Sequence, residues 1–123
     1  MKKVLLIMSL FSSFFGVKAQ ADNVIELLSP AEFISCTNHD DVQFIDVRTQ
    51  KEFAAGVINN PINLDYYQQK TFLEGLKDLD KNRPVYVYCQ AGGRSAKAAK
   101  ILKKNGFQKV YDLHGGYSSI SKR

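Results

Sequence analysis

Apolar and polar positions along the chain form short blocks, and these blocks predict strands separated by helices. Residues 42–47 and 85–88 are apolar runs rich in β-branched and aromatic side chains, which is typical of buried strands. Shorter runs of the same kind predict a last strand, a short strand and an edge strand near the start. These weaker strands cover residues 109–113, 62–64 and 24–28.

The segments between the strands predict helices. Ser29-Pro30-Ala31-Glu32 and Thr49-Gln50-Lys51-Glu52 both have the residue order of a capping box, which opens a helix. Residues 67–79 carry apolar side chains at helical spacing, and residues 95–104 are rich in alanine and lysine. Because strands alternate with helices, we predict an α/β fold with a central parallel sheet of four or five strands, flanked by helices on both faces.

The first residues have the order of a secretory signal peptide. Two lysines precede an apolar run at residues 4–17, and small residues follow, with cleavage expected after Ala19 or Ala21. As a helix this run would be about 21 Å long, which is shorter than the hydrocarbon core of about 30 Å. We therefore expect an exported protein, periplasmic or secreted, with no stable membrane anchor and a single domain at residues 22–123.

Charge and side-chain chemistry limit the partners. The chain carries a formal net charge of +5, and loss of the three lysines in residues 1–21 leaves +2. A dedicated basic surface is not expected, so no nucleic-acid partner is predicted. His39 lies beside Asp40 and Asp41, but adjacent carboxylates rarely converge on one ion, and this segment is interpreted as a loop. No metal and no cofactor are expected.

The chain has only two cysteines, whereas small disulfide-stapled domains usually carry four or more. Cys89 directly follows the strand at 85–88, at the carboxyl edge of the predicted sheet, and Cys36 belongs near the opposite edge. A strand of five residues spans about 17 Å, but a disulfide needs Cα atoms within about 7 Å. We predict that the two cysteines do not pair within one chain and that Cys36 is a packing residue or an unused thiol.

The segment after Cys89 combines several features that favour a thiolate. The predicted helix directs its N-terminal amides and the positive end of its dipole toward the sulfur. Gly92 and Gly93 allow the loop to curl, and Arg94 adds a permanent positive charge. Cys89 is therefore the candidate nucleophile, with a structural cysteine in a glycine-rich turn as the alternative. The candidate anion-binding loop comprises Gln90, Ala91, Gly92, Gly93, Arg94 and Ser95.

Further segments accompany this loop in a fixed order. They are Phe44-Ile45-Asp46-Val47-Arg48, Glu52-Phe53 with Gly56, Ile62-Asn63-Leu64, Val110-Tyr111-Asp112-Leu113 and Gly115-Gly116-Tyr117. Together with the loop they closely resemble the signature blocks of rhodanese-like sulfurtransferases, and most of all the small single-domain periplasmic rhodaneses of the phage-shock type. The chain departs from the family pattern after Gly56, where Val57-Ile58-Asn59-Asn60-Pro61 replaces the usual His-Ile-Pro-Gly-Ala.

The resemblance implies an enzyme of the thiosulfate sulfurtransferase type with a three-layer rhodanese-like fold. It would move a sulfane sulfur from thiosulfate or a similar donor to cyanide or a thiol through a Cys89 persulfide. Arg94 would bind the anion, and Asp46 and Arg48 would support the loop, with a purely structural ion pair as the alternative. The implied partners are a small anionic sulfur donor and a thiol or cyanide acceptor, and a protein can supply the acceptor.

Two other functions fit the same residues. One is a non-enzymatic sulfur-relay or binding module for a protein partner. The other is a cysteine-dependent phosphatase or arsenate reductase, whose loop has five residues between cysteine and arginine. Only four residues separate Cys89 from Arg94 here, and the shorter ring suits the sulfur of thiosulfate better than phosphate.

Overall fold

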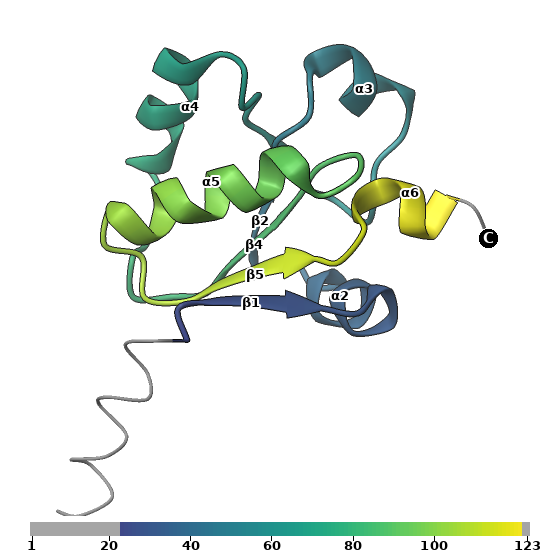
Figure 1. Ribbon diagram of the computed structural model, residues 1–123, viewed down its shortest axis with the longest axis horizontal. Helices are drawn as coiled ribbons and strands as arrows, with labels where there is room; N and C mark the ends of the chain where they lie inside the picture. The colour runs from purple at the N-terminus through teal and green to yellow at the C-terminus, as the bar shows by residue number, and fades with distance from the viewer. Residues whose placement is uncertain (1–22, 122–123) are drawn as a thin grey trace, which may run out of the picture.

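In the computed structural model, five parallel strands form one sheet in the order β1-β5-β4-β2-β3. The arrows of β1 and β5 lie side by side in Figure 1. The structure describes residues 23–121. The predicted signal peptide lies outside these residues, so export stays a prediction. The strands are β1 (Ile25–Leu28), β2 (Gln43–Asp46), β3 (Ile62–Asn63), β4 (Val85–Tyr88) and β5 (Val110–Leu113). The helices are α2 (Pro30–Thr37), α3 (Gln50–Ala55), α4 (Gln69–Leu76), α5 (Gly93–Lys104) and α6 (Gly116–Ser121).

Helices cover both faces of the sheet, which confirms the predicted three-layer α/β architecture. Side chains alternate along the central strand β4, so Val85 and Val87 point to one face while Tyr86 and Tyr88 point to the other. The first face packs against α4 and α5, through residues such as Phe72 and Leu102. The second face packs against α2 and α6 through Phe33, Tyr117 and Ile120.

Two helices begin at the predicted capping boxes. In α2 the Ser29 hydroxyl accepts the Glu32 N–H at 3.3 Å, and Glu32 Oε1 accepts the Ser29 N–H at 3.2 Å. Thr49 and Glu52 form the same pair of bonds at the start of α3. These bonds satisfy amides that the first turn of a helix leaves without partners, which is why both starts are readable in the sequence.

The structure differs from the prediction at the ends of other elements. Helix α4 stops at Leu76 and α5 begins at Gly93, two residues earlier than predicted. Helix α6 was not predicted at all. It is only six residues long, and serine, glycine and tyrosine in its sequence are weak helix formers. Its position depends on tertiary contacts with the loop after β4, described below.

The two cysteines lie on different faces of the sheet, and both are free thiols. Cys36 lies within the last turn of α2, and it packs beside the apolar cluster of the second face. Cys89 belongs to the apolar cluster of the first face. This arrangement agrees with the prediction that they do not pair.

Candidate active site

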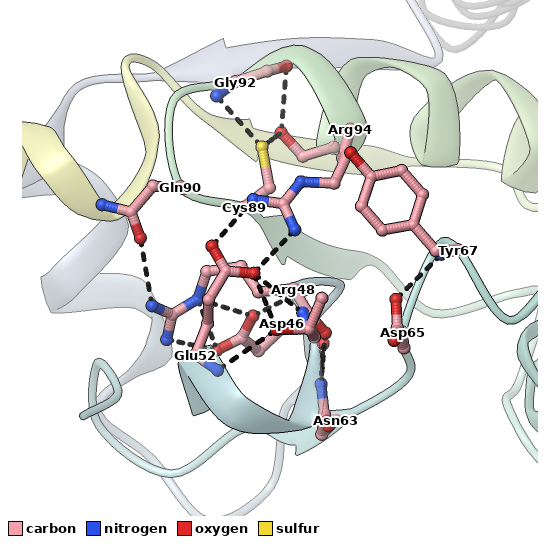
Figure 2. Close-up of polar contacts among 12 residues, drawn as sticks. Asp46, Arg48, Glu52, Asn63, Asp65, Tyr67, Cys89, Gln90, Gly92 and Arg94 are labelled. Atoms are coloured by element: carbon pink, nitrogen blue, oxygen red, sulfur yellow. Dashed lines mark hydrogen bonds and ion pairs between the residues drawn. The ribbon is translucent and has the colours of Figure 1, made fainter. Parts of the chain in front are cut away.

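Cys89 directly follows the central strand β4 and precedes α5, at the carboxyl edge of the sheet where parallel α/β folds bind ligands. The residue is only 1% exposed. Figure 2 shows its sulfur enclosed by the turn that leads into α5. The sequence placed the candidate nucleophile at this edge, and the structure confirms the position.

Two polar contacts reach the sulfur. The Gly92 N–H donates to Cys89 Sγ at 3.0 Å, and the Ser95 Oγ lies 3.4 Å from the same sulfur. The Ser95 hydroxyl also lies 3.3 Å from the Gly92 carbonyl oxygen. Gly92 is the N-cap of α5 and has φ +109°, a left-handed conformation that favours glycine. The amide at the N-terminus of α5 therefore points at the sulfur. This arrangement stabilises negative charge on the sulfur.

Helix α6 holds the carbonyl side of the same loop. The Tyr117 N–H donates to the Cys89 carbonyl at 2.8 Å, and the Ser118 N–H donates to the Gln90 carbonyl at 2.9 Å. Gly116 permits this close approach, because a Cβ there would lie 2.6 Å from the carbonyl oxygens of Cys89 and Gln90. With its carbonyls turned toward α6, the loop is free to present amides to the sulfur. The Gly115-Gly116 pair was the only sequence signal for this contact.

The predicted supporting pair lies beneath the loop and touches it. Arg48 and Asp46 are both buried, and their closest contact is 2.7 Å between Nη2 and Oδ2. The Arg48 guanidinium also donates to Gln90 Oε1 at 3.2 Å and lies 4.4 Å from the centre of the Tyr117 ring. The pair is therefore a buried structural ion pair that also reaches the loop through Gln90.

Arg94 forms a bidentate ion pair with Glu52 of α3, as Figure 2 shows. Its Nη1 and Nη2 donate to the two carboxylate oxygens at 2.7 and 3.0 Å, and the guanidinium lies 5.3 Å from the centre of the Tyr67 ring. The hydrogen bond from Arg94 is the main reason why the pKa of Glu52 falls to about 2. The predicted anion-binding arginine therefore already has a carboxylate partner. Glu52 was predicted as a capping-box residue and quoted in a signature block, but not as the partner of Arg94.

A buried carboxylate lies on the neighbouring strand. Asp112 of β5 is 2% exposed, and its Oδ1 has no hydrogen-bond partner within residues 23–121. Burial raises the pKa of Asp112 to about 6, although the nearby Ser95 hydroxyl and Leu113 amide act in the opposite direction. Ser95 is therefore near Asp112 as well as in contact with Cys89. Asp112 was quoted only as part of the block Val110-Tyr111-Asp112-Leu113, and nothing in that run indicated that its carboxylate is buried.

Metal sites and membrane spans have structural signatures of their own. Between residues 23 and 121, no three His, Cys, Asp or Glu side chains converge as metal ligands would. No helix in that range has both the length and the apolar character needed to cross a bilayer.

Comparisons with known proteins agree with this geometry. The Rhodanese-like domain profile matches residues 29–123. The tRNA uridine(34) hydroxylase of Cytophaga hutchinsonii is 40% identical over 91 residues, which cover 72% of this chain and 29% of that protein. YqhL of Bacillus subtilis is 35% identical over 94 residues, covering 76% of this chain and 71% of that protein. A rhodanese-like domain protein of Staphylococcus aureus superposes with a TM-score of 0.63 at 30% identity, covering 74% and 86% of the two chains.

Proposed function

The chain belongs to the rhodanese-like domain family, and from this premise we propose that it is a sulfurtransferase that carries sulfur as a persulfide on Cys89. The observation that carries the proposal is the contact between Cys89 Sγ and the Gly92 N–H at the start of α5. An amide and a helix N-terminus stabilise the negative sulfur that such a reaction needs both before and after transfer.

The reaction divides into two displacements. The Cys89 thiolate attacks the sulfane sulfur of a donor such as thiosulfate, the sulfur–sulfur bond of the donor breaks, and its electron pair leaves with sulfite. The outer sulfur of the resulting persulfide is then attacked by cyanide or a thiolate, and the electron pair of that bond returns to Cys89. Charge and electrons balance without any other reactant, and covalent catalysis of this kind divides one transfer into two steps.

The length of the loop supports sulfur as the transferred group. Four residues separate Cys89 from Arg94, one fewer than in the cysteine phosphatases considered above. In addition, the Arg94 guanidinium is held by Glu52 and is not free to clamp a phosphate. A phosphatase is therefore not favoured by this site.

The curated hydroxylase relatives do not decide the reaction of this chain. The chain spans less than a third of the length of the Cytophaga hutchinsonii hydroxylase, so the two share one domain. Hydroxylation of tRNA is the activity of that longer protein. What the shared domain supports here is cysteine-dependent chemistry at Cys89, for which sulfur transfer is our proposal.

Thiocyanate formation from thiosulfate and cyanide tests the proposal. We expect turnover with the wild-type protein, none with Cys89→Ser, and full turnover with Cys36→Ser as the matched cysteine control. Cys36 suits this purpose because it lies on the opposite face of the sheet. Turnover that survives in Cys89→Ser would rule out Cys89 as the sulfur carrier.

A further inference from the structure

Each basic side chain that the polar contacts bring to the loop is already paired with a carboxylate. Arg48 reaches the loop through Gln90 and is paired with Asp46. Arg94 belongs to the loop itself and is paired with Glu52. The four side chains together carry no net charge, so their combined field attracts anions weakly. A dianion entering the site gains little from arginines that are neutralised in this way.

Glu52 is held in this position from two directions. Its Oε1 accepts the Thr49 N–H at 3.0 Å, and the same oxygen accepts Arg94 Nη1 at 2.7 Å. The Glu52 and Arg94 side chains are 30% and 16% exposed, so both are partly buried rather than free in solvent. Because the capping box already orients the Glu52 carboxylate, Arg94 pairs with a fixed group and not with a mobile one.

We propose that Glu52 determines the charge preference of the site, disfavouring dianionic sulfur donors and favouring persulfides of low net charge. This inference rests on the proposed sulfur transfer and specifies its donor class. The energy of a charge in the field of Glu52 scales with the charge of the donor, so a dianion is disfavoured twice as strongly as a monoanion. Thiosulfate carries two negative charges, whereas cysteine persulfide carries a net charge of one.

The substitution Glu52→Gln removes this charge with little other change. Glutamine also serves in capping boxes, because its amide oxygen can accept the Thr49 N–H. The chain offers a matched control in Glu32, which closes the equivalent capping box of α2. No ion pair involves Glu32 within residues 23–121. Glu32→Gln therefore reports the effect of a neutral capping residue away from the site.

The experiment compares kcat/KM for thiosulfate and for cysteine persulfide at low ionic strength, with cyanide as acceptor. Coulomb's law for partly screened charges sets the scale of the effect, and we expect kcat/KM to change by about fivefold per unit of donor charge. We expect Glu52→Gln to raise the ratio of kcat/KM for thiosulfate to kcat/KM for cysteine persulfide by about fivefold, mainly through KM. Arg94→Gln should lower the ratio, and Glu32→Gln should leave it unchanged. An unchanged ratio in Glu52→Gln, or an equal change in Glu32→Gln, would overturn the inference.

A binding measurement separates this inference from the proposed reaction. Sulfate is an unreactive dianion, and its dissociation constant is measured by calorimetry in Cys89→Ser and in Cys89→Ser with Glu52→Gln. Tighter sulfate binding without Glu52 supports the inference even if no protein turns over, in which case only the proposed sulfur transfer fails. Equal binding overturns it. If Glu52→Gln does not fold, sulfate binding is compared between Cys89→Ser and Cys89→Ser with Arg94→Gln. Weaker binding is expected in the double variant, and equal binding contradicts the inference.

Discussion

Replacement of Asp112 by asparagine should change how the stability of the domain depends on pH. The carboxylate is buried on β5, and one of its oxygens has no hydrogen-bond partner in the described structure. Burial raises its pKa to about 6 because the ionised form loses its hydration. Asparagine has nearly the same shape but does not titrate, so Asp112→Asn removes this ionisation and leaves the packing largely intact.

The expected magnitude follows from the pKa of Asp112 in the two states. An ordinary aspartate has a value of 3.8, and the folded protein raises it to about 6. Each pKa unit corresponds to about 1.4 kcal/mol, so ionisation of Asp112 disfavours the folded state by at most about 3 kcal/mol. Because the pKa of Asp112 is higher in the folded than in the unfolded protein, Asp112 does not destabilise the fold below about pH 4. The destabilisation develops as the pH rises through about 6, since the unfolded chain releases its proton first.

Urea unfolding of wild-type protein and Asp112→Asn at pH 4 and pH 7 measures this effect. The free energy of unfolding of the variant, relative to wild type, should be about 2 to 3 kcal/mol larger at pH 7 than at pH 4, which means a more stable variant at pH 7. Asp78→Asn provides the control, because it makes the same chemical change at an exposed surface position. A difference between Asp112→Asn and wild type that is the same at both pH values would refute the reasoning.

Three further substitutions test the supports of the loop. Gly116→Ala places a Cβ 2.6 Å from two loop carbonyl oxygens, so the rate of thiocyanate formation should fall at least about tenfold. Unchanged turnover would contradict the proposal that α6 holds the carbonyl side of the loop. Arg48→Met leaves Asp46 buried without its cation, and urea unfolding should show that the free energy of unfolding falls by about 3 to 5 kcal/mol. A fall of less than about 1 kcal/mol would mean that Asp46 finds another partner. Tyr88→Phe removes the phenol oxygen that accepts the Ile58 N–H at 3.2 Å, and should cost about 1 to 2 kcal/mol in the same assay, with no loss as the contrary result.

Much of the fold was predictable because its signals are local. The capping boxes at Ser29 and Thr49 involve residues three apart, so the bonds that start α2 and α3 can be recognised in sequence. The β-branched and aromatic run at 85–88 predicted the central strand. The position of Cys89 followed from these two kinds of signal together, since a residue between a strand and a helix lies at the carboxyl edge of a parallel sheet.

The remaining features depend on contacts that no local pattern encodes. Arg94 and Glu52 are 42 residues apart, and their pairing requires α3 and the loop to meet above the sheet. Asp112 becomes important only because the register of β5 places it beside Val87 of β4, in a buried position. Helix α6 is held by bonds from Tyr117 and Ser118 to the loop rather than by its own sequence. These three features were missed for the same reason.

Mass spectrometry of the folded, reduced protein after incubation with thiosulfate or cysteine persulfide tests the central claim most directly. We predict that wild-type protein and Cys36→Ser each gain the mass of one sulfur atom, that peptide mapping places it on Cys89, and that cyanide removes it. Cys89→Ser should gain nothing. No added sulfur on reduced Cys89 with either donor, or the same gain in Cys89→Ser, would contradict a persulfide carrier at this site.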